Sequence, residues 1–193
     1  MKQIVFFGDS LTAGYGLRSA STESFPALLQ QQIIKAGFPY QIINAGISGD
    51  TSQSGLSRLE NVLQYPADIF FLGLGANDIL RSYPSSTTAV NLDKIITRVK
   101  EKYPKVKIVL LGMELPEWIV ASIADTYRKL YRGLAEKHNL SYLPFLLEGV
   151  IGKAELNLPD RLHPNAKGYQ IIASRLWPVL QNLLEKADQG DEQ

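Results

Sequence analysis

The chain of 193 residues contains no cysteine, and that absence excludes several classes of protein. A protein without thiols has no disulfide framework, no cysteine nucleophile and no thiolate metal site. Histidine is scarce as well, because His138 and His163 are the only two. We therefore expect no multi-histidine metal centre.

The sequence also lacks an excess of charge of either sign. Its 20 lysines and arginines against 19 aspartates and glutamates give a formal net charge of +1. A protein that binds nucleic acid usually presents a strongly basic face. We therefore expect no nucleic acid among the partners of this protein.

Long hydrophobic runs are missing too. No stretch approaches the ~20 apolar residues that span a bilayer, and the longest candidates, such as residues 68–74 (DIFFLGL), have the length of a strand. Near the N-terminus the apolar run is IVFF at residues 4–7, whereas a signal peptide needs ~7–15 apolar residues. These features predict no integral membrane segment, and either a cytoplasmic protein or a periplasmic or secreted one whose export signal has been removed.

The length and composition are typical of one globular domain. Domains average about 150 residues, and a hydrophobic content of 45% is ordinary for a globular protein. The sequence has no internal repeat, low-complexity linker or shift of composition that marks a second unit. We predict a single domain over residues 1–187 and a polar C-terminal tail over residues 188–193.

Short apolar runs alternate with longer segments of helical periodicity. This alternation is typical of βαβ units and of a parallel sheet that helices cover on both faces. Consecutive apolar residues indicate strands that are buried on both sides. The sequence therefore predicts an α/β protein with a five-stranded, doubly wound parallel sheet. The expected strands are residues 4–7, 40–44, 68–74, 106–111 and, more weakly marked, 141–144.

Periodic apolar residues, capping residues and prolines between these runs predict five helices. Pro178 lies inside the last helix and predicts a kink or a local break there. The expected helices run from Glu23 or Ser24 to Ala36, from a cap at Asp50 or Thr51 through Leu63, from Thr87 to Tyr103, from Glu117 to Asn139, and from Pro164 to about Lys186.

Polar motifs follow three of the expected strands, and a fourth precedes the last helix. Ligands of doubly wound sheets bind beyond the carboxyl ends of the strands, so we expect these motifs at one edge of the sheet. The fourth motif holds one of the two histidines. The motifs are GDSLTAGYG at residues 8–16, NAGISGDT at 44–51, GLGAND at 73–78 and DRLHP at 160–164.

These residue types suit nucleophilic acyl transfer. That chemistry needs a hydroxyl, a base that takes its proton and a group that orients the base. Ser10 supplies the hydroxyl, His163 the imidazole and Asp160 a carboxylate three residues before it. Pro164 keeps His163 extended, because the residue before a proline is disfavoured in the α region. The nucleophile-elbow pattern GxSxG is absent, so a catalytic serine lies in a different turn, near the N-terminus.

Each of these residues also has a simpler interpretation. Ser10 alone is typical of a turn or a helix N-cap, and the turn around it is a weak candidate for phosphate binding because it lacks GxGxxG and a P-loop lysine. Gly49 and Asn77 alone suit turns. His163 alone fits a helix N-terminus without a function, and His138 fits a solvated helix end. Each simpler interpretation is reasonable for one residue. Taken together they are unconvincing, because all four motifs would have to reach the same edge of the sheet by chance.

The four motifs, taken in order, resemble the four blocks of the SGNH/GDSL hydrolases. The matching residues are GDSL at 8–11, NAGISGDT at 44–51, GAND at 75–78 and DRLHP at 160–164, and they extend over nearly the whole chain. The longer phrase GISGDTSQSGLSRL at residues 46–59 is similar to the bacterial group of multifunctional thioesterases, lysophospholipases and arylesterases.

The resemblance implies a role for each matching residue. Ser10 is then the nucleophile, and Asp160 and His163 complete the triad. The oxyanion hole comprises the Ser10 N–H, the Gly49 N–H and the Asn77 side-chain amide. The implied fold is a flavodoxin-like three-layer α/β/α sandwich without metal or cofactor. The implied activity is a serine esterase that hydrolyses carboxylic esters or thioesters through an acyl-enzyme, with a small acyl-ester or lipid-like substrate.

The segment after the fourth strand departs from the family pattern. The bacterial group usually has an asparagine–tyrosine–glycine stretch after a proline there, whereas this chain has GMELPEWI at residues 112–119. Leu115, Trp118 and Ile119 either line an apolar substrate groove or begin the core face of the long helix. Glu114 and Glu117 are expected to disfavour strongly anionic substrates such as acyl-CoA.

Two other functions compete with this assignment. A carbohydrate O-acetylesterase uses the same constellation and belongs to families of this type. A binding module that keeps the sandwich without catalysis fits less well, because all the required groups are present.

Overall fold

A computed structural model describes residues 2–114 and 121–190 and contains a five-stranded sheet. All strand pairs are parallel and the strand order is β2-β1-β3-β4-β5, which is the flavodoxin-like order. The five predicted strands are therefore confirmed. They are β1 (Lys2–Gly8), β2 (Tyr40–Gly46), β3 (Ile69–Gly73), β4 (Lys107–Leu111) and β5 (Ser141–Leu143).

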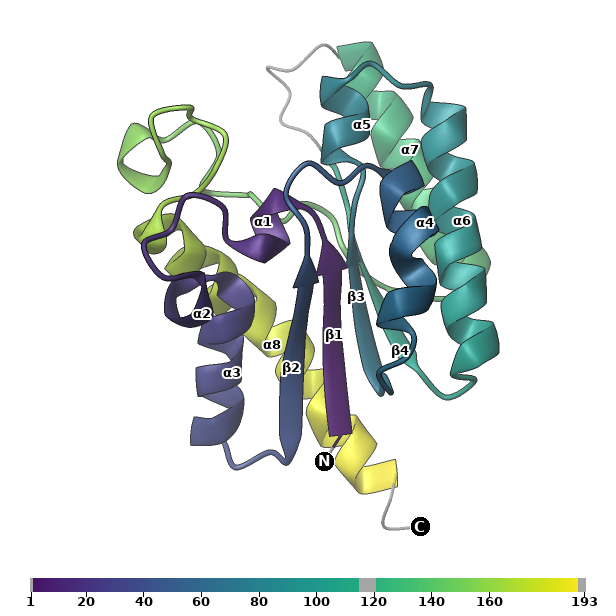
Figure 1. Cartoon of the computed structure of the whole chain (residues 1–193), viewed down its shortest axis with the longest axis vertical. Coiled ribbons are helices and arrows are strands. Elements are labelled where there is room, and N and C mark those ends of the chain that lie inside the picture. Colours follow the sequence, from purple (N-terminus) through teal and green to yellow (C-terminus); the bar gives the residue numbers. More distant parts are fainter. Residues whose placement is uncertain (1, 115–120, 191–193) are drawn as a thin grey trace.

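Helices cover both faces of the sheet, as the alternating pattern predicts (Figure 1). Helices α3 (Phe25–Lys35) and α8 (Ala166–Gly190) pack on one face. Helices α4 (Ser52–Val62), α6 (Ser85–Lys102) and α7 (Ala121–His138) pack on the other. The result is the predicted three-layer α/β/α sandwich. The short helical segments, which the periodicity does not predict, are α1 (Ser10–Ala13), α2 (Ala20–Glu23), α5 (Ala76–Leu80) and the 3-10 turn η1 (Ala154–Leu156).

The last helix differs from the expectation at its start and in its middle. Asn165 caps it, because its side-chain oxygen accepts hydrogen bonds from the N–H groups of Lys167 and Gly168. Pro164 lies before the helix and forms an isolated bridge with Asn157. Helix α8 continues through Pro178, so the predicted local break is absent. Among residues 2–114 and 121–190, no helix combines the length and the apolar character that crossing a bilayer requires.

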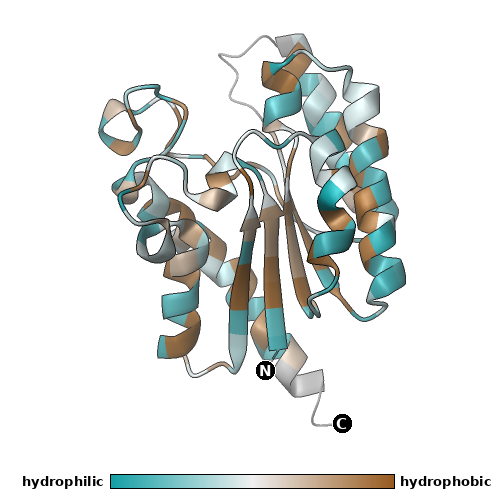
Figure 2. Ribbon diagram, viewed as in Figure 1, coloured by the Kyte–Doolittle hydropathy of each residue, from teal (hydrophilic) through white to brown (hydrophobic). Residues whose placement is uncertain are grey.

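The central strands place aromatic side chains in both cores. Phe6 and Phe71 stack with ring centroids 4.2 Å apart on the α3/α8 side. Their neighbours Phe7 and Phe70 point to the opposite face of the sheet, where they pack against α4 and α6. Successive side chains of a strand point to opposite faces, so a strand buried on both sides is apolar at consecutive positions. Figure 2 shows these hydrophobic strands between the two helical layers.

The order of the strands brings three of the four motifs side by side. Gly8, the last residue of β1, is in register with Gly46 of β2 and with Gly73 of β3. The segments that follow these glycines therefore emerge together at the carboxyl edge of the sheet. Figure 1 shows α1 above the arrowheads of β1 and β2 at this edge.

Helix α1 lies so close to β2 that Gly46 has no room for a side chain. A Cβ atom at Gly46 would lie 2.3 Å from the backbone nitrogen of Ala13. That neighbour is backbone, so only a shift of the whole α1 turn relieves the contact. Gly46 thus fixes the distance between the second strand and the turn that carries Ser10.

Asp9 caps α1 from inside the protein. Its carboxylate accepts a hydrogen bond from the Leu11 N–H at 3.0 Å, and the residue is only 1% exposed. Burial raises the pKa of the Asp9 carboxyl from 3.8 to about 7; the carboxylates of Asp50 and Asp78 add to the increase, and the Leu11 N–H opposes it. The residue next to Ser10 is thus an acid whose charge the fold disfavours.

We expect Gly46→Ala to destabilise the protein by about 1–3 kcal/mol, because the added methyl group overpacks against a backbone atom. The matched control is Gly133→Ala in α7, where a Cβ atom meets open space and alanine favours the helix by ~1 kcal/mol. Thermal unfolding should give a Tm below that of the wild type for the first variant and equal to or above it for the second. An unchanged Tm in Gly46→Ala would contradict the tight packing of α1 on β2.

We expect Asp9 to make stability depend on pH between its unfolded and folded pKa values, 3.8 and about 7. Because the folded pKa is raised, the neutral acid stabilises the fold below about pH 4, and this contribution is lost as the pH rises through 7, by up to roughly 1.4 kcal/mol per pH unit. Asp9→Asn keeps an acceptor for the Leu11 N–H and does not titrate. Denaturant unfolding of both proteins should show a difference in free energy that changes across this window and is constant above about pH 8. Parallel pH profiles would show that Asp9 titrates normally.

Candidate active site

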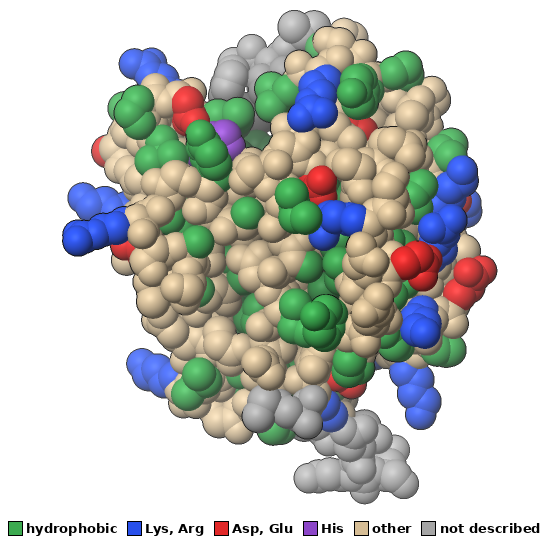
Figure 3. Space-filling model, viewed as in Figure 1, with side chains coloured by type: hydrophobic (Ala, Val, Ile, Leu, Met, Phe, Trp, Pro, Cys, Tyr) green, Lys and Arg blue, Asp and Glu red, His purple; other side chains and the backbone are tan. Residues whose placement is uncertain are grey.

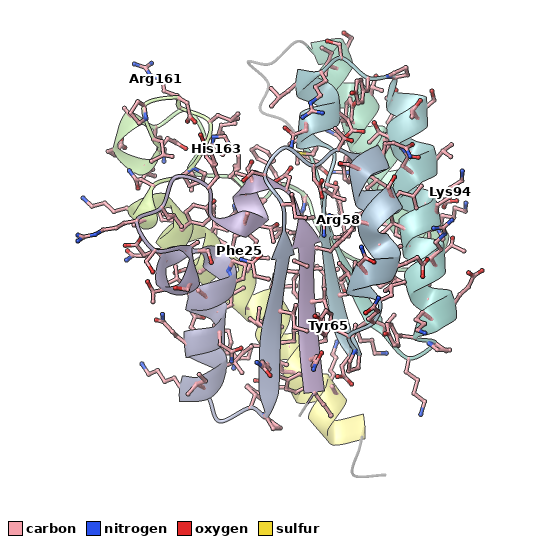
Figure 4. The ribbon with its side chains drawn as sticks, in the orientation of Figure 1. Phe25, Arg58, Tyr65, Lys94, Arg161 and His163 are labelled. Carbon is pink, nitrogen blue, oxygen red and sulfur yellow. The ribbon has the colours of Figure 1, made fainter. Side chains whose placement is uncertain are left out.

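Ser10 and His163 meet in the folded protein, although 153 positions separate them in the sequence. The Ser10 hydroxyl oxygen lies 2.9 Å from Nε2 of His163, and Nδ1 of His163 lies 2.7 Å from a carboxylate oxygen of Asp160. Figure 4 shows His163 beside α1, at the carboxyl edge of the sheet. The three residues form a continuous hydrogen-bonded chain with the geometry of a serine–histidine–aspartate triad.

The Asp160 carboxylate is held by the segment that leads to His163. One oxygen accepts the N–H groups of Leu162 and His163 at 2.9 and 3.0 Å, and the other faces the His163 ring. Partial burial acts to raise the pKa of Asp160, but the hydrogen bonds from His163 and Leu162 outweigh it and lower the pKa to about 2. An ionised carboxylate only accepts hydrogen bonds. Nδ1 of His163 therefore carries a proton, and Nε2 is the atom available to take the Ser10 proton.

Backbone contacts position both ends of this chain. Ser10 is the first residue of α1, after the Asp9 cap, so the interpretation of Ser10 as the N-cap is wrong. The Tyr169 hydroxyl of α8 donates to the Leu11 carbonyl at 2.9 Å and holds the α1 turn from below. The His163 carbonyl accepts the Leu158 N–H at 2.7 Å.

Two of the predicted oxyanion residues, Gly49 and Asn77, lie in the segments that follow β2 and β3. Gly49 has a φ of 83°, in the left-handed region that favours glycine, and Asn77 lies in the first turn of α5. The side-chain amide nitrogen of Asn77 donates to the Asp50 carbonyl at 2.9 Å, next to Gly49. In the described part of the chain, no acceptor pairs with the N–H of Ser10 or of Gly49. These donors are free for a ligand oxygen.

Buried polar contacts fix α5, which carries Asn77, and the residues that lead into it. The Asp78 carboxylate is fully buried and accepts hydrogen bonds from the Ser52 N–H at 2.8 Å and from the Thr88 hydroxyl at 3.1 Å. The Tyr131 hydroxyl of α7 donates to the Leu74 carbonyl at 2.5 Å. The Asn77 amide is thus carried by a segment that contacts from α4, α6 and α7 hold in place.

Figure 3 shows a histidine side chain in a hollow of the surface, at the place where Figure 4 labels His163. Tyr15 lies on this side of the molecule, with its ring centroid 4.7 Å from that of His163 and half of the residue exposed. Within residues 2–114 and 121–190, no three His, Asp or Glu side chains are grouped as metal ligands.

The predicted substrate-groove residues Leu115, Trp118 and Ile119 lie outside the described residues, as does Glu117. Glu114 is described, and its carboxylate pairs with Arg132 through contacts of 2.6 and 3.0 Å. The Arg132 hydrogen bond lowers the pKa of Glu114 despite partial burial. Arg132 therefore offsets the negative charge of Glu114, and the effect of Glu114 and Glu117 on anionic substrates stays a prediction.

Sequence reasoning missed three residues that make contacts near the site. Arg58 contacts Asp50 and two backbone carbonyls, Arg81 donates to the Gly49 carbonyl, and Tyr15 packs on His163. Two signals in the sequence could have indicated them. Asp50 and Arg58 are eight positions apart across the start of a predicted helix, and Tyr15 is an aromatic residue between two glycines.

His138, the second histidine, is not the solvated helix end that the sequence indicates. Its side chain is only 13% exposed, and its Nε2 atom lies 2.6 Å from the carboxylate of Asp93. The contact joins the end of α7, which carries His138, to α6, which carries Asp93.

Comparison with known proteins identifies the family to which the chain belongs. Residues 6–171 match the model of the GDSL-like Lipase/Acylhydrolase family. An arylesterase of Vibrio mimicus is 35% identical over 173 residues, which cover 89% of this chain and 84% of that protein. The thioesterase 1/protease 1/lysophospholipase L1 of Escherichia coli (strain K12) is 33% identical over 182 residues, which cover 94% of this chain and 84% of that protein.

A crystal structure of TesA shares the fold with a TM-score of 0.88 and 31% sequence identity, and the match covers 94% of this chain and 99% of that chain. The resemblance stated from the four sequence blocks is thus confirmed. The chain is a hydrolase of ester bonds, and it belongs to the GDSL-like lipase/acylhydrolase family.

Proposed function

We propose that Ser10, His163 and Asp160 are the catalytic triad of this ester hydrolase. The observation that carries the proposal is the chain of contacts from the Ser10 hydroxyl to His163 at 2.9 Å and from His163 to Asp160 at 2.7 Å. The spacing of these atoms is the one that general-base activation of a serine requires. No rearrangement of the described residues is needed for the first proton transfer.

In the acylation step, the Ser10 oxygen attacks the carbonyl carbon of the ester while Nε2 of His163 takes the hydroxyl proton. Asp160 stabilises the imidazolium that forms and keeps the ring in its orientation. The bond to the leaving group then breaks, and His163 gives its proton to the departing alcohol or thiol. The product of this half is an ester between the acyl group and Ser10.

In the deacylation step, water occupies the place of the departed alcohol and His163 takes one of its protons. The resulting hydroxide attacks the acyl-enzyme carbonyl, and the bond to Ser10 breaks as its oxygen regains the proton from His163. The acid is released and the original protonation states return. The same base thus serves both halves of the reaction.

Negative charge develops on the carbonyl oxygen in both halves. We assign its stabilisation to the N–H groups of Ser10 and Gly49 and to the side-chain amide of Asn77. Support comes from the position of the three donors at the ends of β1, β2 and β3, which are neighbours in the sheet. Donors held in place before the reaction lower the barrier without reorganisation.

The proposed substrates are small acyl esters, aryl esters, lysophospholipids and acyl thioesters. The names of the Vibrio mimicus arylesterase and of the Escherichia coli thioesterase and lysophospholipase support this range. The pairing of Glu114 with Arg132 supports including substrates that carry negative charge.

Ser10→Ala is expected to lower kcat for p-nitrophenyl acetate by at least ~10³-fold, because the other triad members cannot act without the nucleophile. The matched control is Ser174→Ala on the exposed side of α8, where the hydroxyl contacts only the Gln170 carbonyl. Release of p-nitrophenol by both variants and the wild type checks the prediction, and circular dichroism shows that each is folded. Normal turnover by a folded Ser10→Ala protein would contradict the assignment of the nucleophile.

A further inference from the structure

Arg58, on α4, reaches the carboxyl edge of the sheet and contacts the ends of β1 and β2 and the loop that follows β2. Its Nε donates to an Asp50 carboxylate oxygen at 2.5 Å. Its Nη2 donates to the carbonyl of Gly8 at 3.1 Å and to the carbonyl of Ala45 at 2.9 Å. Figure 4 shows Arg58 between α4 and the end of β1. One guanidinium thus joins the ends of β1 and β2 to the loop after β2.

The surroundings of Arg58 suit a guanidinium specifically. The guanidinium carbon lies 4.2 Å from the centroid of the Phe7 ring, so the planar group covers an aromatic side chain. The side chains of Arg58 and Asp50 are 16% and 8% exposed, respectively. A planar fork with several donors satisfies the carboxylate and two carbonyls together, whereas a lysine ammonium is a compact point charge that does not stack in this way.

Two partners of Arg58, Gly8 and Asp50, are close in the sequence to proposed oxyanion donors. Gly8 precedes Ser10 by two residues, and its carbonyl also accepts the Ile47 N–H at 3.0 Å. Asp50 follows Gly49 directly, and the Asp50 carbonyl accepts the Asn77 amide at 2.9 Å. The partners of Arg58 are the Asp50 carboxylate and two backbone carbonyl groups. Its influence on the reaction therefore passes through the backbone that carries the donors.

We propose that Arg58, with Asp50, is a positioning residue that holds Gly49 and Asn77 at the correct distance from Ser10. This inference rests on the proposed function, because it assumes that these three residues bind the oxyanion. The transition state benefits from the positioning more than the bound substrate does, since full charge on the oxygen appears only there. Loss of Arg58 should therefore lower kcat more than it raises KM.

Two weaker roles for Arg58 predict different results. A purely structural ion pair would change the Tm and leave kcat intact once the protein is folded. Simple neutralisation of the Asp50 charge would be restored in full by a lysine. Positioning through the fork predicts a loss of kcat in both Arg58→Met and Arg58→Lys, with the lysine variant less affected.

The first experiment measures kcat and KM for p-nitrophenyl acetate at a temperature well below the Tm of every variant. We expect Arg58→Met to lower kcat ~10–100-fold with KM within about twofold of the wild type, because small displacements of catalytic groups are costly. Arg58→Lys and Asp50→Asn should lower kcat to a smaller extent, and they test the proposal if the methionine variant does not fold. The matched control is Arg98→Met, which removes an exposed arginine paired with Glu60 at 3.6 Å and should leave kcat unchanged.

A double-mutant cycle with Asn77→Ala tests the route of the effect. Asn77→Ala alone should lower kcat ~10²–10³-fold, as for the loss of one oxyanion donor. If Arg58 acts through this hole, Arg58→Met should cost less in the Asn77→Ala background than in the wild type. Wild-type kcat in Arg58→Met, complete restoration by Arg58→Lys, or strictly multiplicative losses would each overturn the inference.

Failure of this inference is distinguishable from failure of the proposed function. An inactive Ser10→Ala protein together with a fully active Arg58→Met protein overturns only the role of Arg58. An active Ser10→Ala protein overturns the triad on which both rest.

Discussion

The hydrogen bond between Ser10 and His163 depends on the whole sandwich, because it joins the end of the first strand to the segment before the last helix. A parallel sheet places all its carboxyl ends on one edge, and the order β2-β1-β3 puts β1 between the other two motif-bearing strands. The Tyr169 hydroxyl then ties α8 to the Leu11 carbonyl, so the helix that follows His163 supports the turn that carries Ser10. The geometry of the proposed triad is in this sense a property of the fold.

The surroundings of two aspartates near Ser10 shift their pKa values in opposite directions. Asp160 accepts three hydrogen bonds from residues 162 and 163, and its pKa falls to about 2. Burial raises the pKa of Asp9, directly before Ser10, to about 7. The first can stabilise an imidazolium, and the second caps α1 at a cost in stability once it is ionised. Environments that separate the pKa values of similar groups are typical of active sites.

The strands and the residues of the four polar motifs were the parts of the structure most predictable from the sequence. The five strands were predictable because residues such as Phe6 and Phe7 are apolar at consecutive positions, and the Asp160–His163 contact was predictable from a spacing of three residues. Arg58 was not, because its carbonyl partners lie 13 and 50 positions away and an arginine in an amphipathic helix usually faces solvent. Helix α1 is too short to show periodicity, and Arg161 adopts a φ of 57° without a glycine to indicate it.

The central claim is that the Ser10 oxygen attacks the ester while the neighbouring loops bind the developing charge. The most direct measurement is a crystal structure of the protein after reaction with a fluorophosphonate, whose phosphorus is attacked as the ester carbon is. The account predicts a bond between phosphorus and the Ser10 oxygen, with the phosphoryl oxygen within hydrogen-bond distance of the Gly49 N–H and the Asn77 amide. An adduct on another residue, or a phosphoryl oxygen directed away from both donors, would contradict it.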